Sequence, residues 1–358
     1  MANATYTVII KDPGTAKIWE LLPKSYNFNE RLNEEPIATF SFSFEELKAM
    51  ASRNDTTVLN IFTAALREIY IERNGTKIFY GVVSDFEVTP GGVGEKNVTV
   101  KAMGFFGLFR KRIVGKGTET RYTTTDAGDI AWDLIDDSQS ADSPYSTYGI
   151  TQGVTPATKN RTRGYLFDNV YDEIVRLSNN NLAEGFDFDI DTTKAFNVYY
   201  PTKGTARPTV VFDERTMRIW KYKKSLFTDM ANDIWVVGEG VNDDINFERR
   251  TASTGLRTPF GTLEEKIDAR NTTEDGTLQD KGDHRLDNAS APVITLDNVS
   301  HFDQEDLIAY TDYNLGDTVI VNLPELDITN DIKRVIERSF TMQTPESIAL
   351  CSLKLKTV

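Results

Sequence analysis

The sequence predicts a mainly β protein with an α+β insertion: two related β-barrel-like domains, a small α+β domain and a small charged helical insertion. Strand-like runs separated by tight turns fill the first third of the chain. They begin again near residue 206 and include the last stretch of the sequence. Helical spacing interrupts them after residue 118, and a polar, charged stretch interrupts them near residue 255. The predicted boundaries are 1–118 for the first barrel, 119–205 for the α+β domain, 255–291 for the insertion, and 206–254 with 292–358 for the second barrel.

The strongest local signal in the first domain is a hairpin. Residues 68–73 and 77–87 carry alternating apolar side chains around Asn74-Gly75, a pair that favours a type I′ turn. Residues 39–44 also alternate, with three phenylalanines on one face, and a short helix is expected at 45–51. Other predicted features are strands at 6–11, 18–22 and 96–103, a turn at 12–15, and a glycine-rich loop at 90–94.

The α+β domain is predicted from helical spacing followed by strand alternation. Residues 125–129 can cap a first helix, and a second helix is expected over 168–179 from apolar residues at helical spacing, of which Phe167 is the first. A strand over 185–191 is then expected to pair with 195–200. The apolar positions of the first helix are Ile130, Trp132 or Ala131, Leu134 and Ile135.

The rest of the chain returns to β character around the insertion. Within the insertion, 263–269 is expected to form a short helix and 272–287 a helical piece or a loop. The closing stretch enters its first strand through the turn Leu315-Gly316-Asp317. The predicted strands of the second barrel are 208–212, 219–224, 234–238, 293–298, 318–321, 333–340 and 347–355.

The composition limits the classes of function that fit this chain. Lys and Arg total 40 against 54 Asp and Glu, a net charge of −14, which argues against binding nucleic acid through phosphate contacts. The N-terminus lacks the basic leader of a secretory signal, and no apolar run approaches the roughly 20 residues of a membrane helix. We therefore expect synthesis in the host cytoplasm and no membrane insertion.

Residues that often carry catalysis are scarce. The one cysteine, Cys351, lies in an apolar alternation and is expected to be a small core residue. The two histidines, His284 and His301, sit in polar contexts without a zinc-binding pattern or triad partners. We predict no catalytic residues, no cofactor and no metal, although a pair of acidic residues acting on glycosidic bonds remains an alternative.

Three local patterns invite a binding role. Asp187, Asp189 and Asp191 suggest calcium, but the EF-hand positions for Gly and Glu are not filled. Their spacing of two instead predicts the solvent face of a strand, with Phe186, Phe188 and Ile190 facing the core. The glycine-rich segments 238–240 and 90–94 lack the context of nucleotide-binding loops, so both are expected to be turns.

An apolar and basic cluster ends the first domain. Phe105, Phe106, Leu108 and Phe109 precede Arg110-Lys111-Arg112. Two interpretations are open: a patch facing nucleic acid or a protein partner, or a strand or turn that leaves the core with basic residues capping it. The acidic composition favours the second interpretation or a protein partner.

Three short motifs in their order resemble the tail hub, or baseplate hub, proteins of long-tailed, non-contractile bacteriophages. Residues 78–83, IFYGVV, resemble the family's hairpin, and 107–114, GLFRKRIV, resemble its turn that closes the first domain, here with a lysine between the arginines. Residues 315–319, LGDTV, resemble its turn into the last barrel, preceded by a charged insertion at 263–287. The likeness spans nearly the whole chain, and each motif is short.

This resemblance implies a non-enzymatic virion protein at the tail tip or baseplate. It implies a homotrimer whose six barrels adapt a sixfold tail tube to a threefold tip, close the distal end of the tube and line the DNA exit channel. Its expected partners are a distal tail or tail tube protein above, and tip, fibre or receptor-binding proteins below. The lumen leaves room for a tape measure protein, and an acidic lumen lets viral DNA pass without specific binding.

Two other functions stay open from the sequence. One is a tail tip module that binds carbohydrate on the host surface, and the other is an enzyme that degrades cell walls. The first would need an exposed aromatic face, for which the candidates are Tyr145, Tyr148, Tyr165, Tyr199 and Tyr200. We expect these tyrosines to be packing residues.

Overall fold

The computed structural model describes most of the chain. The described residues are 5–12, 18–63, 67–91, 95–140, 148–178, 185–225, 229–240, 244–269, 275–303, 307–342 and 349–357. Tyr145 and most of the turn expected at 12–15 lie outside them. No helix in the described ranges is long and apolar enough to cross a membrane.

The N-terminal β module is built from seven strands and two short helices. Asn74 and Gly75 both have positive φ, as a type I′ turn requires, and they join β5 to β6 as predicted. Phe40 and Phe42 of the alternating run are buried in β4, whereas Phe44 starts α1. The elements are β1 (Tyr6–Lys11), β2 (Ile18–Leu21), β3 (Ser25–Arg31), β4 (Ile37–Ser43), α1 (Phe44–Arg53), α2 (Val58–Thr63), β5 (Glu68–Arg73), β6 (Thr76–Pro90) and β7 (Lys96–Gly104).

The C-terminal β module uses six strands from the second half of the chain. Gly316, with φ of +95°, and Asp317 form the predicted turn into β21. The elements are β15 (Ala206–Phe212), β16 (Ile219–Ser225), β20 (Val293–Phe302), β21 (Thr318–Leu323), η3 (Pro324–Leu326), β22 (Ile328–Met342) and β23 (Leu350–Thr357).

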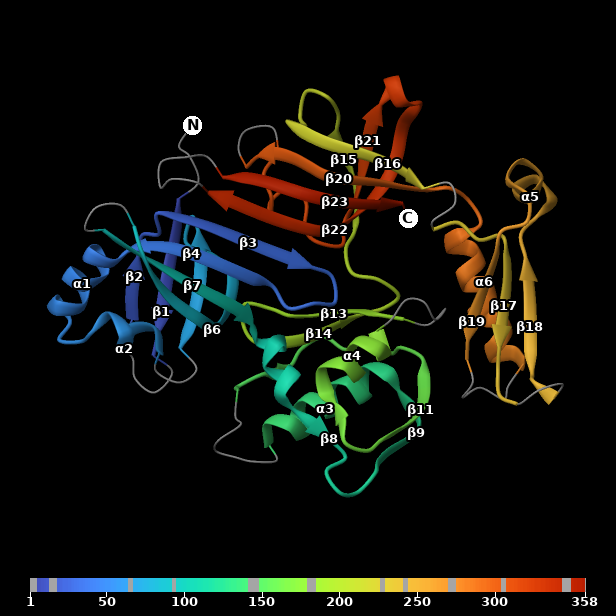
Figure 1. The fold of residues 1–358 in the computed structure, drawn as a ribbon, viewed down its shortest axis with the longest axis horizontal. Helices are drawn as coiled ribbons and strands as arrows, with labels where there is room; N and C mark the ends of the chain where they lie inside the picture. Colours follow the sequence, from blue (N-terminus) through green and yellow to red (C-terminus); the bar gives the residue numbers. More distant parts are fainter. Residues whose placement is uncertain are drawn as a thin grey trace.

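The two β modules form one curled sheet of 13 strands and share one hydrophobic core. The sheet runs β16-β20-β23-β22-β3-β4-β7-β6-β5-β1-β2, and β15 and β21 branch from β22. Apart from β2, the strands of the two modules follow the same order, β3-β4-β7-β6-β5-β1 in one and β16-β20-β23-β22-β21-β15 in the other. The modules meet where β22 lies beside β3 (Figure 1).

The α+β unit packs below this sheet around its own core (Figure 1). Both predicted helices are present, because Ile130, Leu134, Ile135 and their counterparts in the second helix are buried on one face. Phe167 is an exception: it precedes the second helix with φ of +58° and is 65% exposed. The elements are η1 (Phe105–Lys111), β8 (Ile113–Val114), β9 (Thr120–Asp126), α3 (Ala127–Ser140), β10 (Thr151–Gln152), β11 (Asn160–Tyr165), β12 (Asp168–Asn169), α4 (Val170–Ser178), β13 (Asp187–Ile190) and β14 (Ala195–Tyr199).

The small insert has a sheet of three strands covered by one helix, to the side of the body (Figure 1). Its strands are β17 (Asp233–Val237), β18 (Phe247–Thr251) and β19 (Glu264–Asp268), and its helices are α5 (Thr254–Phe260) and α6 (Asp275–Ala289).

Two predictions about this segment were wrong. Residues 263–269 form a strand instead of a helix, because β19 pairs in parallel with β17 and this pairing outweighs the helix-forming Glu and Lys side chains. The strand predicted at 234–238 pairs with β18 and β19, and with no described strand of the second β module.

Candidate functional site at the junction of the modules

The junction between the β modules is a continuous antiparallel ladder. Glu337–Met342 of β22 pair with Tyr26–Arg31 of β3. Phe28 and Phe340 stand opposite each other in this ladder, are fully buried, and stack with ring centroids 6.1 Å apart. Backbone hydrogen bonds and buried aromatic surface therefore hold the modules together at this place.

A buried ion pair crosses the same ladder. The Arg338 guanidinium donates to one carboxylate oxygen of Glu30 from Nη2 at 2.7 Å and from Nε at 2.9 Å. Its central carbon lies 3.7 Å from the ring centroid of Tyr310, whose hydroxyl also donates to Glu30. Burial lowers the pKa of Arg338, but the neighbouring Glu30 carboxylate outweighs it and raises that pKa above its usual range. The cation is therefore fixed in the protein interior by its partners.

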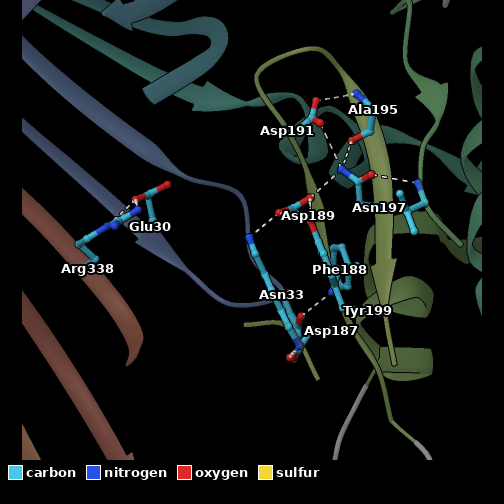
Figure 2. A network of polar contacts seen from close by, with 12 residues as sticks. Glu30, Asn33, Asp187, Phe188, Asp189, Asp191, Ala195, Asn197, Tyr199 and Arg338 are labelled. Atoms are coloured by element: carbon cyan, nitrogen blue, oxygen red, sulfur yellow. Dashed lines mark hydrogen bonds and ion pairs between the residues drawn. The ribbon is translucent and has the colours of Figure 1, made fainter. Parts of the chain in front are cut away.

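Asp187 ties the α+β unit to both β modules, and Figure 2 shows it beside Asn33 of the N-terminal module. The sequence predicted that this residue faces solvent, but it is fully buried. It accepts hydrogen bonds from Asn33 Nδ2 at 3.1 Å and from the Lys203 backbone N–H at 2.6 Å, and it forms an ion pair with Arg334 of β22. The prediction failed because the other face of β13 is covered by the sheet, which alternation alone does not reveal.

The other two aspartates hold the β13–β14 hairpin. Asn197 Nδ2 donates to Asp189 at 3.1 Å and to Asp191 at 3.3 Å (Figure 2). Asp191 also accepts from the backbone N–H groups of Thr193 at 2.7 Å and Ala195 at 3.0 Å. Burial raises the pKa of Asp191, but these hydrogen bonds outweigh it and lower the pKa. Asp191 therefore closes a turn.

Among the described residues, no group of three or more His, Cys, Asp or Glu side chains is arranged to hold a metal ion. The polar partners of the three aspartates are amides, backbone N–H groups, Tyr199, Lys203 and Arg334.

A second polar link joins the α+β unit to the N-terminal module. Lys194 Nζ lies 2.5 Å from Glu68 Oε1 of β5, and the Tyr80 hydroxyl donates to Glu68 Oε2 at 2.6 Å. Burial raises the pKa of Glu68, but these two hydrogen bonds and the charge of Lys194 outweigh it and lower the pKa. The carboxylate is thus held ionised where the two units meet.

The junction also contains a cleft of about 400 Å³. Its walls come from all three units, with Phe79 from the N-terminal module, Phe106 and Asp189 from the α+β unit, and Tyr310 and Arg338 from the C-terminal module. The ionic groups of Arg338 and Asp189 are already engaged with Glu30 and Lys203. The cleft is therefore a seam between units, and these two charges in its walls are satisfied internally.

Asp317 fixes the start of the last hairpin. It is 2% exposed and accepts hydrogen bonds from the backbone N–H groups of Thr205 at 2.7 Å and Asn314 at 2.9 Å. Arg207 Nε donates to Oδ2 of the same carboxylate at 2.9 Å. The Leu-Gly-Asp motif thus connects the strand that enters the C-terminal module, β15, with the turn into β21.

The lone cysteine and His301 lie in one buried cluster. His301 is 1% exposed although its neighbours in the sequence are polar; His284 lies partly buried on α6. His301 Nε2 lies 2.6 Å from the Tyr313 hydroxyl, which lies 3.3 Å from Cys351 Sγ. Burial raises the pKa of Cys351 to about 12, so the thiol is not a thiolate at neutral pH. Cys351 is the core residue that the sequence predicted.

The apolar and basic cluster forms a 3₁₀ helix. Phe105, Phe106 and Phe109 are buried in the core of the α+β unit. Arg110 pairs with Glu35 at 2.8 Å, and its guanidinium lies 3.7 Å from the Tyr171 ring centroid. This matches the expectation of a turn with a basic cap and leaves Arg110 engaged within the chain.

The remaining expected turns and tyrosines can be placed where they are described, and Tyr148 and Tyr200 are partly buried against the core of the α+β unit. Gly238 N–H donates to Asn246 across the β17–β18 hairpin, and Pro90 pairs with Lys96 across the β6–β7 hairpin. Tyr165 is buried, and the Tyr199 hydroxyl donates to Asp189. These two tyrosines do not contribute to the exposed aromatic face that carbohydrate binding would need.

The fold is similar to that of solved tail proteins, two of which come from prophages. Over 99% of this chain and 98% of the other, it is similar to the 43 kDa tail protein of prophage MuSo2 from Shewanella oneidensis, with a TM-score of 0.71 and 10% identity. A tail protein from Neisseria meningitidis gives 0.65 and 13% identity, covering 98% and 96% of the chains. Prophage tail protein gp18 from Listeria monocytogenes gives 0.61 and 12% identity, covering 98% and 94%. No family model and no curated protein matches the sequence.

Proposed function

We propose that this chain is a structural tail protein that assembles as a threefold hub at the distal end of a phage-type tail. The observation that carries the proposal is the repeat of one strand order in two modules that are joined edge to edge by β22 and β3. Three such chains present six similar modules, which lets a threefold assembly meet a sixfold tube. The shared fold with tail proteins over nearly the full length supports the same role.

In this proposal the chain is divided as the sequence predicted, with one adjustment. The first β module, the α+β unit and the second β module keep their places, while strand pairing assigns 233–251 to the insert. The modules form the ring, and the α+β unit and insert lie on its periphery. The continuous core across β22 and β3 makes the pair of modules one rigid part of that ring.

The proposed partners follow from the position of such a ring. A distal tail or tail tube protein docks on one side, and tip, fibre or receptor-binding proteins dock on the other. The net charge of −14 suits a channel that DNA passes without adhering, with room for a tape measure protein before ejection. We propose no catalytic step, and the protonated Cys351 and internally paired Asp189 and Asp187 agree with that.

The mass in solution and the shape of the particle test this proposal. Sedimentation velocity of the purified chain should give a species of three chains, and negative-stain images should show a ring with an open centre. A stable monomer at micromolar concentration, without such rings, would contradict the hub. Binding of purified cell-wall polysaccharide by that monomer would favour the carbohydrate-binding alternative, and release of soluble wall fragments would favour the enzyme.

A further inference from the structure

The two long strands of the sheet are equivalent in detail. Both β6 and β22 have 15 residues, and each carries a β-bulge at the same place along its length. On β6 the register shifts between Val83 and Asp85 against β7, and on β22 it shifts between Val335 and Glu337 against β23. Ser84 and Ile336 are therefore equivalent positions, and the residues after them can be matched one to one.

The neighbours of these equivalent strands differ on one edge. After its bulge, β22 pairs with β3 along Glu337–Met342. After its bulge, β6 pairs with β7 on one edge only, and no described strand occupies the edge that corresponds to β3. The side chains of Asp85, Glu87 and Val88 are exposed in this half of the strand, and Val88 is 41% exposed.

The counterpart of β3 in the second module is β16, and no described strand occupies its outer edge either. β3 pairs with β4, and β16 pairs with β20, at the same place in the shared strand order. β3 uses its other edge for β22, whereas β16 ends the described sheet. β6 therefore presents an edge equivalent to the edge of β22 that pairs with β3. β16 presents an edge equivalent to the edge of β3 that pairs with β22.

We infer that the distal half of β6 pairs with β16 of a second copy of this chain. The contact repeats between chains the junction that β22 and β3 make within a chain. It is heterologous, since β6 meets β16, so it continues from chain to chain until the ring closes. The inference rests on the proposed hub and names the surface through which its chains assemble.

The charges of the two edges are complementary. The free half of β6 carries Asp85 and Glu87, and β16 carries Lys221, Lys223 and Lys224. Lysines on an edge strand discourage pairing with other strands in general. Pairing with a strand that places acidic side chains opposite them is favoured.

The β22–β3 ladder also fixes the register of the inferred contact. Counted from the two bulges, Glu87 of β6 is equivalent to Ser339 of β22, which lies opposite Asn29 of β3. Lys223 of β16 is equivalent to Asn29, so Glu87 is expected to lie opposite Lys223. Val88 then stands opposite Tyr222, as Phe340 stands opposite Phe28. The inferred opposing pairs are Asp85 with Ser225, Phe86 with Lys224, Glu87 with Lys223, Val88 with Tyr222, Thr89 with Lys221, and Pro90 with Trp220.

Disulfide cross-linking of the assembled protein tests this register. The double variant Glu87→Cys with Lys223→Cys should oxidise to covalent dimers and trimers, because side chains directly opposite in a ladder are close enough for a disulfide. The matched control is Glu87→Cys with Lys224→Cys, whose second side chain points to the other face of the sheet. Cys351 is fully buried and stays out of the reaction.

Single-cysteine and charge-reversal variants complete the test. Glu87→Cys alone should not cross-link, and a covalent dimer from it would mean that β6 pairs with its own copy, which overturns the inference. Glu87→Lys should raise the trimer dissociation constant roughly two- to fivefold, as expected for like charges across a ladder. Combining it with Lys223→Glu should restore the wild-type value, and failure to restore it would count against the pairing.

The outcomes separate this inference from the hub itself. A wild-type trimer in which Glu87→Cys with Lys223→Cys cross-links no better than its control overturns the β6–β16 contact and leaves the hub standing. A wild-type chain that stays monomeric, and whose cysteine pairs do not cross-link, overturns both. A trimer that is locked by the matched pair alone supports both.

Discussion

The guanidinium of Arg338 donates two hydrogen bonds, at 2.7 and 2.9 Å, to one carboxylate oxygen of Glu30 across the ladder that joins the two β modules. The arginine side chain is 2% exposed, and that of Glu30 is 18% exposed. A buried cation of this kind is tolerated only while its partner remains, because the interior cannot solvate it. The junction therefore depends on a pair of residues 308 positions apart in the sequence.

Removing the charge of Glu30 should destabilise the junction strongly. We expect Glu30→Gln to lower the free energy of unfolding by about 3–5 kcal/mol, since it leaves Arg338 buried without a counter-charge. The measurement is the midpoint of urea unfolding followed by circular dichroism. Glu337→Gln is the matched control: its partner Arg31 is half exposed, so the expected loss is below about 1 kcal/mol. Equal effects of the two substitutions would contradict the assigned role of Arg338.

Asp187 should control how firmly the α+β unit holds to the sheet. Asp187→Asn removes the counter-charge of Arg334 at a fully buried position, so we expect a loss of about 3 kcal/mol. Limited proteolysis should then cut faster between the α+β unit and the C-terminal module. Asp172→Asn is the control: it lies on the exposed face of α4 and removes one charge from the first turn of the helix, so the expected loss is below about 1 kcal/mol and the cleavage rate should not change. A wild-type cleavage rate in Asp187→Asn would show that other contacts hold the unit.

Stability should depend on the ionisation of Glu68 in acid. Its pKa is lowered in the folded protein, so its contribution is fully present above the unfolded value of about 4.3 and is lost as the pH falls through the folded pKa. Glu68→Gln should therefore be less stable than the wild type at pH 7, and the difference should shrink as the pH falls below that unfolded value. Urea midpoints across this range give the measurement. A difference that grows on acidification would have the wrong sign.

Calcium should not stabilise the β13–β14 hairpin. Asp187 is committed to Arg334, and Asp191 closes a turn through the N–H groups of Thr193 and Ala195. We expect the unfolding temperature to be the same with millimolar calcium as with a chelator, measured by scanning calorimetry. A rise of several degrees with calcium, abolished in Asp191→Asn, would reveal a site that these contacts conceal.

Local sequence patterns predicted the elements that local physics controls. Asn74-Gly75 specified its hairpin because few residues accept positive φ at both turn positions. The apolar spacing that includes Leu134 and Ile174 specified the helices α3 and α4. Cys351 was correctly placed in the core because its neighbours alternate. Each of these signals lies within a few residues of the feature that it predicts.

The candidate site was predicted less well, since its residues come from distant segments. Asn33, Arg334 and Glu30 occupy no motif, and only their place beside Asp187 and Arg338 gives them a role. The sequence did contain one indication of a buried charge. In β22, Arg338 lies two residues before Phe340 and four before Met342, so its side chain is expected on the same inward face of the strand. A charged side chain at an inward position predicts a buried partner, although alternation does not say which one.

The sequence by itself determined the mainly β class, the main hairpins and helices, and the absence of a basic nucleic-acid footprint. These follow from turn chemistry, apolar periodicity and net charge, which act locally or on the whole chain at once. Only the tertiary structure decided that β22 of one module pairs with β3 of the other, that β19 is a strand, and that Asp187 is buried. Strand partners are chosen by packing between segments far apart in the chain, and a residue's burial depends on what covers the second face of its strand.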